Sequence, residues 1–459
     1  MKKGILEYFE EIMKIPRESG KEEKITEYLV KFAKENNLEY KVGKYNTVYL
    51  RKNNNSNKTI ILQAHSDMVC VSNESYDFDD KGIPFYIDGD YYKSQNTSLG
   101  ADDGIGIAII LAVLQESENM PNIEVMITTQ EETTMLGANN FDYSLVEGKT
   151  LISLDGIKEA DIESSSAGMC SITMKKEINY EVSNESCYKL SISGLIGGHS
   201  GDDIEKNRCN AIKLAVRLLE KINCKSISDI NFGKRDNVIP SEGYVVFSSK
   251  EDIESINEKI GKIEFNLNTE ESSLKLKIEN SEGKTAIKES KEIIEFISKI
   301  KNGMLEVYKD DEFPLLSANI GKISIKDNQI EIKYSIRSSD LLKEEELLRE
   351  ISILSSEYGF ELTIDANKPF FPYKDKSIIR TILAETYKEL YGKETTIKKV
   401  HACMEGGILS NNIQDLDICT IAPTIENCHS INERVSISST KRVYEWLKQT
   451  LVKYNKYEN

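Results

Sequence analysis

The four histidines of this 459-residue chain all lie in short stretches that are rich in carboxylates, glycine or other polar side chains. Imidazole nitrogens and carboxylate oxygens are ligands that zinc and similar divalent ions bind in proteins. Histidines that are so rare and so consistently placed favour a metal-dependent hydrolase as the leading hypothesis. They are His65, His199, His401 and His429.

His65 and Asp67 lie two residues apart near the end of the apolar segment Thr59 to Val69. Residues with this spacing on a strand point to the same side of the sheet, and open α/β sheets carry their sites at the carboxyl ends of strands. One side chain can bind a metal ion while the other orients it. Taken alone, such a pair is more often a buried core histidine beside a turn aspartate.

Asp102 and Asp103 are adjacent in a glycine-rich stretch before the apolar segment Gly104 to Gln115, which we expect to be a buried helix. Carboxylates are favourable at a helix N-terminus, so a capping role is one interpretation of this pair. A metal site is the other, because two consecutive acids can supply a bridging ligand and its partner.

Two further predicted strands end in carboxylates. Glu131 and Glu132 follow the apolar segment Asn122 to Gln130, and Asp155 ends the apolar stretch that begins at Leu151. In so acidic a chain a solvated loop is the alternative interpretation. However, an apolar strand that ends in acids delivers them to the crevice at the edge of a sheet, which favours a functional role.

The segments that carry these motifs alternate between strand-like and helix-like patterns. Thr59 to Val69 and Asn122 to Gln130 are short, rich in β-branched residues and apolar on both faces, as strands in a helix-covered sheet should be. The helix expected over Gly104 to Gln115 lies between them in the chain. This strand–helix–strand order predicts an α/β domain.

Capping residues predict where several helices begin. The sequence Ser19-Gly-Lys-Glu22 is a capping box, so we expect its serine and glutamate to satisfy backbone N–H groups at the start of a helix. We also expect Asp375 to cap a helix in the C-terminal part of the chain. The last helix is expected to begin at Ser439 or Thr440.

From about Leu190 the pattern changes to strands that alternate between apolar and polar residues, with a hairpin turn expected at Asp327-Asn328. Interleaved amphipathic helices make this region an expected α+β sandwich. Because motifs lie on both sides of it, we expect residues 188–368 to be inserted into an α/β domain formed by residues 1–187 and 369–459. The expected helices of the insertion are Asn210 to Ile222, Lys288 to Ile300 and Leu342 to Glu357.

Composition narrows the expected partners and location. A formal net charge of −17 disfavours binding to nucleic acid or to anionic membranes, and no apolar run is long enough to span a bilayer. The eight cysteines are scattered without a CxxC motif, which predicts a reducing compartment. Charged residues interrupt the N-terminal segment, which we expect to be an amphipathic helix and not a signal peptide. These features predict a cytoplasmic protein.

The chain resembles the dinuclear zinc hydrolases, a family of aminoacylases, carboxypeptidases and dipeptidases, in the order of five motifs: HSD, GADDGIG, QEE, LD and CHSINE. It is similar to the bacterial aminoacyl-histidine (Xaa-His) dipeptidase branch in the segments IPRESGKEEKI, GLIGGHSG and HACMEGG. The resemblance covers essentially the full chain. It implies a zinc-peptidase catalytic domain with a central, mostly parallel sheet, and an inserted lid domain through which relatives form homodimers.

The resemblance implies two divalent metal ions as cofactors, expected to be zinc, with manganese or cobalt as alternatives. The residue that matches the bridging aspartate of relatives is Asp102. His65 and Asp155 would complete the ligands of one ion, and Glu132 and His429 those of the other. Two divalent cations need several carboxylates for charge balance, and this set provides them.

The resemblance also implies catalytic roles for two residues. Glu131 would act as general base on a water shared by the two ions and would later pass the proton to the leaving amine. Asp67 would hold His65 through its second ring nitrogen, as carboxylates commonly do behind metal-bound histidines. In relatives a cis peptide bond follows the bridging aspartate, and here it would join Asp102 and Asp103.

Five more residues match substrate-binding positions of relatives. His199 would stabilise an oxyanion, although an exposed histidine in a glycine turn is the simpler interpretation. Asn237 and Arg337 would grip the substrate, and Arg337 suits a bidentate contact with a terminal carboxylate unless it forms a surface salt bridge. His401 and Glu405 lie in a substrate-side segment of the catalytic domain, where Glu405 would meet a free amino terminus.

We therefore expect a cytosolic metallodipeptidase that hydrolyses short peptides. Departures from the branch after Asp155 and at Cys403 and Gly406 leave its side-chain preference open between Xaa-His and a broader range. A metal-dependent N-acyl-amino-acid deacylase is the alternative enzyme, which Glu405 disfavours. A scaffold that has lost catalysis is the third hypothesis, which the presence of all five ligands and Glu131 disfavours.

Overall fold

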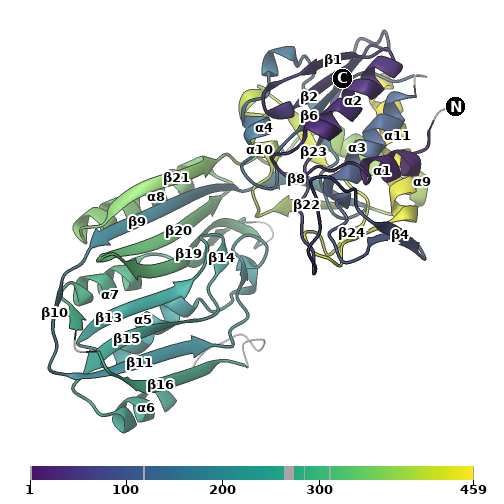
Figure 1. The fold of residues 1–459 in the computed structure, drawn as a ribbon. Helices are drawn as coiled ribbons and strands as arrows, with labels where there is room; N and C mark the ends of the chain where they lie inside the picture. The colour runs from purple at the N-terminus through teal and green to yellow at the C-terminus, as the bar shows by residue number, and fades with distance from the viewer. Residues whose placement is uncertain (1–2, 117–118, 263–272, 284, 310–311, 458–459) are drawn as a thin grey trace. The chain divides into compact units, whose positions relative to one another are not determined.

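The computed structural model describes residues 3–116, 119–262, 273–283, 285–309 and 312–457. The chain, drawn as a ribbon in Figure 1, divides into two compact units. Each unit has its own buried apolar core. None of the helices within the described ranges combines the length and apolar character that a membrane crossing requires. Unit 1 contains the described residues of Met1–Ser166, Phe371–Val400 and Met404–Asn459, and unit 2 those of Ala167–Phe370 and His401–Cys403.

Unit 1 is an α/β domain. Its elements are α1 (Ile5–Ile12), α2 (Glu23–Glu35), β1 (Glu39–Val42), η1 (Lys44–Asn46), β2 (Val48–Lys52), β3 (Thr59–His65), β4 (Phe85–Asp88), β5 (Tyr91–Ser94), α3 (Ala101–Leu114), β6 (Asn122–Thr128), α4 (Leu136–Asn139), η2 (Tyr143–Leu145), β7 (Thr150–Ser153), β8 (Asp161–Ser166), α9 (Ile378–Tyr391), β22 (Thr396–Val400), α10 (Glu405–Asn412), β23 (Asp417–Thr420), β24 (Ile425–Glu426), β25 (Arg434–Ser436) and α11 (Ile437–Lys456). The main sheet has the strand order β1-β2-β6-β3-β7-β23-β8-β22, and a smaller sheet has the order β24-β25-β5-β4. Four successive strands of the main sheet, β6, β3, β7 and β23, run parallel, and β8 is parallel to β22, which confirms the mostly parallel sheet.

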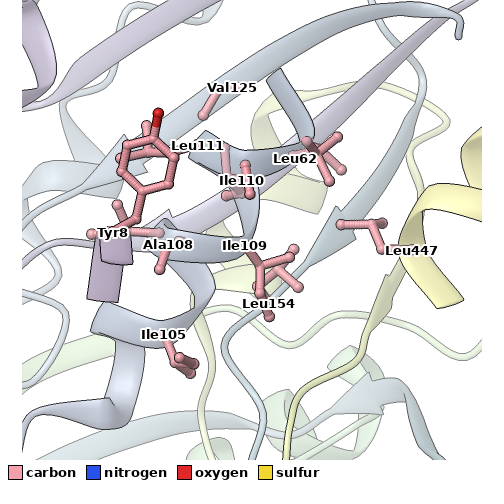
Figure 2. Packing of buried hydrophobic residues seen from close by; sticks show 14 of the residues in the cluster. Tyr8, Leu62, Ile105, Ala108, Ile109, Ile110, Leu111, Val125, Leu154 and Leu447 are labelled. Carbon is pink, nitrogen blue, oxygen red and sulfur yellow. The ribbon is translucent and has the colours of Figure 1, made fainter. Parts of the chain in front are cut away.

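Helix α3 lies at the centre of the unit 1 core. From Ile105 to Leu114 all of its residues are buried, as expected for a segment that is apolar all round. Figure 2 shows Ile109 and Ile110 in one cluster with Leu62 of β3 and Leu447 of α11. Full burial of an isoleucine or leucine side chain contributes about 1.5–3 kcal/mol, so this packing fixes the helix firmly. The acidic residues at its N-terminus are fixed with it.

The parallel strands bring three motif-bearing segments to one edge of the main sheet. His65 and Thr128, the last residues of β3 and β6, are paired with each other. Gln63 of β3 is paired with Ser153, the last residue of β7. The acids that follow each strand therefore leave the sheet at its carboxyl edge, where sites of open α/β sheets occur.

Unit 2 is an α+β domain. Its elements are β9 (Gly168–Glu177), β10 (Tyr180–Val182), β11 (Ser186–Ser193), β12 (Gly198–His199), η3 (Ile204–Lys206), α5 (Ala211–Lys221), β13 (Ser226–Gly233), β14 (Val238–Ile239), β15 (Gly243–Ser249), α6 (Ile253–Gly261), β16 (Lys275–Ser281), β17 (Thr285–Ile287), α7 (Ser290–Lys299), β18 (Gly303–Val307), β19 (Pro314–Lys326), β20 (Gln329–Ser338), α8 (Leu341–Glu357) and β21 (Glu361–Lys368). Its main sheet has the order β16-β11-β15-β13-β19-β20-β9-β21, with β18 beside β19. The predicted hairpin turn is confirmed: Lys326 pairs with Gln329, and Asp327 and Asn328 have φ values of 51° and 59°.

Unit 2 begins earlier in the chain than the expected boundary at residue 188. Strand β9 precedes that boundary, but it pairs with β20 on one side and β21 on the other. Its residues alternate between the buried core side chains Cys170, Ile172 and Met174 and polar side chains between them. This is the pattern of a strand with one face on a core, so unit 2 starts at Ala167.

The predicted capping box at the start of α2 is not formed. The hydroxyl of Ser19 donates instead to the Asp67 carboxylate at 2.7 Å. Glu22 accepts hydrogen bonds from the backbone N–H groups of Gly20 at 2.7 Å and Gln130 at 3.2 Å. Each side chain thus has a partner distant in sequence, Asp67 for Ser19 and Gln130 for Glu22, which a local pattern does not reveal.

Two other helix starts differ by one to a few residues from those expected. Helix α9 is capped by Ser377, whose side chain accepts from the backbone of the first turn, and not by Asp375. Helix α11 is capped by Ser436, which accepts from the N–H of Ser439, so Ser439 and Thr440 lie inside the first turn. The hydroxyl that caps α9 belongs to a serine two residues after Asp375, and the hydroxyl that caps α11 belongs to a serine three residues before Ser439.

We expect the stability of unit 2 to depend on pH through the buried carboxyl group of Glu344 on α8. Its side chain is buried, and burial together with the Glu345 carboxylate raises the pKa of Glu344 to about 7. In the unfolded chain the Glu344 carboxyl ionises near its ordinary pKa of 4.5. Between pH 4.5 and 7 the folded state therefore keeps a proton on Glu344 that the unfolded state has lost. Stability contributed by this residue therefore falls between pH 4.5 and 7.

Glu344→Gln should remove that loss. We expect the variant to be more stable than the wild type by about 2 kcal/mol at pH 8 and to gain little at pH 4.5. Thermal unfolding at the two pH values measures this, with the exposed Glu346→Gln as the matched control. An equal gain at both pH values would contradict the assignment.

Candidate metal centre

His65 ends strand β3 fully buried among carboxylates. Its Nε2 atom lies 3.0 Å from Asp102 Oδ1 and 3.6 Å from Asp155 Oδ1. Asp155 follows β7, the strand that neighbours β3 in the sheet. The register of the sheet therefore explains why these residues, distant in sequence, converge on one imidazole nitrogen.

Asp102 has one carboxylate oxygen towards each of two histidines. Oδ1 faces His65 Nε2 at 3.0 Å, and Oδ2 faces His429 Nε2 at 3.2 Å. The residue lies in the first turn of α3, two residues after Gly100, which has a left-handed φ of 71°. The peptide bond between Asp102 and Asp103 is cis, as expected. This placement gives Asp102 the geometry of a ligand shared by two ions.

His429 and Glu132 form the second side of the cluster. His429 Nε2 lies 2.8 Å from Glu132 Oε1, and the imidazole is about half exposed, in the loop between β24 and β25. Glu132 follows β6 at the carboxyl edge of the sheet. One donor atom each from His65, Asp102 and Glu132 lies within 4.8 Å of the others. The donors are therefore close enough to surround metal ions.

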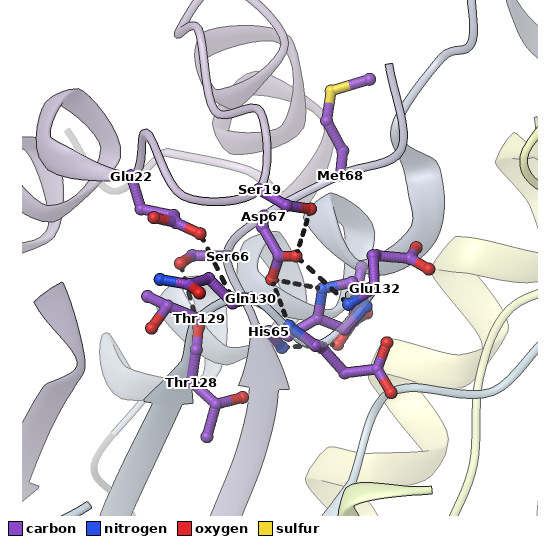
Figure 3. A network of polar contacts seen from close by, with 12 residues as sticks. Ser19, Glu22, His65, Ser66, Asp67, Met68, Thr128, Thr129, Gln130 and Glu132 are labelled. Carbon is purple, nitrogen blue, oxygen red and sulfur yellow. Dashed lines mark hydrogen bonds and ion pairs between the residues drawn. The ribbon is translucent and has the colours of Figure 1, made fainter. Parts of the chain in front are cut away.

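Asp67 ties together the two strand ends that carry the cluster (Figure 3). Its carboxylate accepts the backbone N–H groups of Glu131 at 3.0 Å and Glu132 at 3.3 Å, and the Ser19 hydroxyl at 2.7 Å. His65 Nδ1 lies 3.4 Å from Asp67 Oδ1. Asp67 is completely buried, so this contact fixes the ring of His65 while the segment after β6 is held in place.

The cluster gathers several buried carboxylates, a concentration of negative charge that divalent cations would neutralise. Burial raises the pKa of Asp155 and of Glu132, and burial together with Asp155 raises the pKa of Glu131 well above its usual range. Hydrogen bonds with Asp102 and Glu132 raise the pKa of His429 to about 11. Asp155, Glu132 and Glu131 thus resist ionisation, and the His429 imidazole attracts protons. Two divalent ions would supply the missing positive charge, so the donor set fits them.

Glu405 begins helix α10 beside the same edge of the sheet. Its Oε2 atom accepts hydrogen bonds from Gln63 Nε2 at 2.9 Å and Thr128 Oγ1 at 2.5 Å. Its buried Oε1 atom has no hydrogen-bond partner among the described residues. Burial raises the pKa of Glu405 to about 8. This carboxylate therefore has one oxygen fixed and the other available to a ligand.

The remaining candidate substrate residues lie in unit 2. Arg337 is 3% exposed, and its Nη1 atom has no hydrogen-bond partner among the described residues. Its Nη2 lies 3.4 Å from His199 Nε2, and its Nε lies 3.4 Å from the hydroxyl of Ser200. His199 Nδ1 forms an ion-pair contact with Asp202 at 3.0 Å. The alternative interpretation of Arg337, a surface salt bridge, is thus wrong: the residue is a buried cation without a direct carboxylate contact in the described part of unit 2.

Asn237 and His401 are also fixed by contacts within unit 2. The carbonyl of Asn237 accepts the N–H of Ser200 at 2.9 Å, which joins it to the segment that carries His199. His401 Nε2 lies 2.8 Å from the Ser317 hydroxyl, and burial lowers the pKa of His401 to about 3. His401 belongs to unit 2 and not, as expected, to the same unit as Glu405.

The comparison with known families decides the class of the protein. The model of peptidase family M20/M25/M40 matches residues 61–453. The chain belongs to this family. It is therefore a peptide-bond hydrolase, and the match spans every motif from His65 to His429.

Individual relatives of the family agree with this over nearly the whole chain. A cytosol non-specific dipeptidase of Escherichia coli (strain K12) is 29% identical over 477 residues, which cover 96% of each chain. The crystal structure of an aminoacylhistidine dipeptidase from Vibrio alginolyticus is 26% identical with a TM-score of 0.87, and covers 98% of this chain and 96% of that chain. A tripeptidase from Staphylococcus aureus, 17% identical with a TM-score of 0.63 over 99% and 98% of the two chains, shares the fold.

Two buried charged residues around the cluster have no role assigned from the sequence: Arg17 and Glu433. Asp103 caps α3, because its carboxylate accepts the N–H of Gly106 at 3.1 Å, and it also accepts the N–H of His65 at 3.3 Å. Of the two residues in the acidic pair, Asp103 thus has the capping role. Arg17 and Glu433 lie inside the motifs IPRES and CHSINE, and that position is the one signal the sequence offers for them.

Proposed function

We propose that this peptidase is a dipeptidase that uses two divalent metal ions, bridged by Asp102, at the carboxyl edge of the unit 1 sheet. The observation that carries the proposal is the pair of Asp102 oxygens, each directed at a different histidine. His65 and Asp155 complete one ligand set, and Glu132 and His429 complete the other. Zinc is the metal proposed, because the donors are imidazole and carboxylate, and manganese and cobalt suit the same donors.

Glu131 is proposed as the general base. When bound, the ions would polarise the scissile carbonyl and make an attacking water more acidic. Glu131 takes the proton of that water and passes it to the nitrogen of the leaving amine. Its backbone N–H is held by Asp67, which also contacts His65, so a single buried carboxylate positions both the base and a metal ligand.

Each terminus of the substrate has a proposed partner. Arg337 binds the terminal carboxylate, since a buried guanidinium with an unpartnered Nη1 atom needs an anion. Asn237, His199 and His401 are further proposed substrate-binding residues, and His199 is proposed to stabilise the oxyanion. Glu405 binds the free amino group through the Oε1 atom that lacks a partner. A preference for a free amino group separates a dipeptidase from an N-acyl-amino-acid deacylase.

The protein is proposed to be a cytosolic homodimer. A cytosolic location agrees with the name of the Escherichia coli relative and with the cysteine pattern. The net charge of −17 supports the absence of nucleic-acid and membrane partners. A homodimer formed through unit 2 follows from the resemblance to the family. Light scattering that gives the mass of a single chain would rule out the dimer.

Hydrolysis of a substrate panel by chelator-stripped protein tests the proposed function. The panel contains dipeptides with and without a C-terminal histidine, tripeptides and N-acetyl amino acids, each with zinc, manganese, cobalt or no metal. We expect metal-restored cleavage of dipeptides, and the panel then ranks their side chains. Cleavage of acylated amino acids alone would support the deacylase instead, and no cleavage with any metal would contradict both enzymes.

Arg337→Gln tests the contact with the terminal carboxylate. The loss of a charge-assisted pair of hydrogen bonds should raise KM for dipeptides by about 100-fold. A dipeptide amide, which has no terminal carboxylate, should be cleaved equally by wild type and variant. The exposed Arg349→Gln on α8 is the matched control. An equal loss on the acid and the amide would show that Arg337 does not bind the carboxylate.

A further inference from the structure

The carboxylate of Glu433 is enclosed by the backbone that carries Asp102. Oε2 accepts the N–H groups of Leu99 at 2.8 Å and Gly100 at 2.9 Å. Oε1 accepts those of Ala101 at 2.7 Å and Asp102 at 3.3 Å. Successive N–H groups around a left-handed residue form a concave anion site, and here Gly100 supplies that conformation. The side chain of Glu433 is 2% exposed and occupies this site.

Arg17 holds the opposite side of the same segment. Its Nη2 atom donates to the carbonyl of Gly100, whose N–H faces Glu433. Its Nη1 atom donates to the carbonyls of Ser66 at 3.2 Å and Asp67 at 2.8 Å, directly after His65. Arg17 is 2% exposed, so its guanidinium is shielded from solvent and spans two loops.

The two charged side chains link all three segments from which His65, Asp102 and His429 project. Arg17 joins the end of β3 to the segment before α3, and Glu433 joins that segment to the loop of His429, which it follows by four residues. Their hydrogen bonds with these segments are to backbone atoms. They are therefore suited to place the ligands and not to bind the ions themselves.

We infer that Glu433 and Arg17 are positioning residues that set the spacing of Asp102 from His65 and His429, and thereby the affinity for both metal ions. The inference rests on the proposed metal centre. It requires a carboxylate at position 433, because four N–H donors need two accepting oxygens. A glutamine offers one oxygen, and its NH₂ group would face two of the donors. The isosteric Glu433→Gln therefore disturbs the segment without changing the volume of the side chain.

The test is a cobalt titration of chelator-stripped wild type and Glu433→Gln, followed by the visible absorption of bound cobalt and by competition with a chelator. We expect metal affinity to fall about 10–100-fold, as for other residues that orient metal ligands, and the absorption spectrum to change. The matched control is Glu426→Gln in the same hairpin, where the carboxylate contacts Arg434 and Tyr91. Thermal unfolding of the metal-free proteins reports on folding separately.

Asp102→Asn and His429→Ala are titrated in parallel to separate two kinds of failure. If these variants bind cobalt like the wild type, the proposed metal centre is wrong. If they lose cobalt while folded Glu433→Gln keeps wild-type affinity and spectrum, the positioning role alone is wrong. Should Glu433→Gln not fold, Arg17→Lys replaces it, since a lysine cannot span the three carbonyls. The same 10–100-fold loss supports the inference, and wild-type affinity overturns it.

Discussion

Glu131→Gln is expected to bind two metal ions per chain and to lose about 10²–10⁴-fold in kcat, the usual contribution of a general base. Glutamine has the shape of glutamate but cannot take a proton from water. The residue is held through its backbone N–H by Asp67, so the exchange leaves the neighbouring ligand Glu132 in place. Steady-state kinetics on a dipeptide and metal analysis of the same sample measure both effects.

A matched control for this variant is Glu147→Gln, which removes an exposed carboxylate that pairs with Arg51 elsewhere in unit 1. It should retain both full activity and full metal content. Wild-type kcat in Glu131→Gln would exclude Glu131 as the base. Loss of metal together with activity would instead assign this residue to ion binding.

Asp102→Asn is expected to lose both metal ions and to lower activity by about 10³-fold or more, because one carboxylate serves both ligand sets. An asparagine keeps a single oxygen acceptor and places an NH₂ group where the second ion would bind. Metal analysis after dialysis, together with dipeptide hydrolysis at saturating zinc, measures the loss. The exposed Asp88→Asn, which breaks only a contact with Lys93, is the control.

The loss of one ion with the other retained would contradict the bridging geometry. In that case Asp102 would belong to one ligand set only. Retention of both ions and of activity would show that the convergence of His65 and His429 on this carboxylate has no role in metal binding. The two outcomes are distinguished by the number of metal ions that remain per chain.

The elements with a regular pattern of apolar residues were predictable from sequence. Strands β3 and β6 and helix α3 are apolar on all sides, and this pattern reflects burial in a helix-covered sheet. The start of unit 2 was not predictable to the same degree. Strand β9 follows β8 after a single residue, and its membership in unit 2 depends on pairing with β20 and β21, which lie far along the chain.

In the candidate site, too, features set by local sequence were predictable, and contacts with distant segments were not. The proximity of Asp102, His65 and His429 follows from strand ends and from motif order. The contacts that Ser19 and Glu433 make do not follow, because each involves backbone groups presented by a distant segment. Sequence identifies side chains that suit metal chemistry, whereas the groups that position them become visible only when backbone hydrogen bonds are traced.

Dipeptide hydrolysis by this chain should depend on two divalent ions bridged by Asp102. Hydrolysis of a dipeptide by chelator-stripped protein, as zinc is added in known amounts, measures this dependence. We expect no turnover without metal, and activity that rises until two ions are bound per chain. Hydrolysis that persists in the stripped protein, or activity that is complete with one ion per chain, would contradict it.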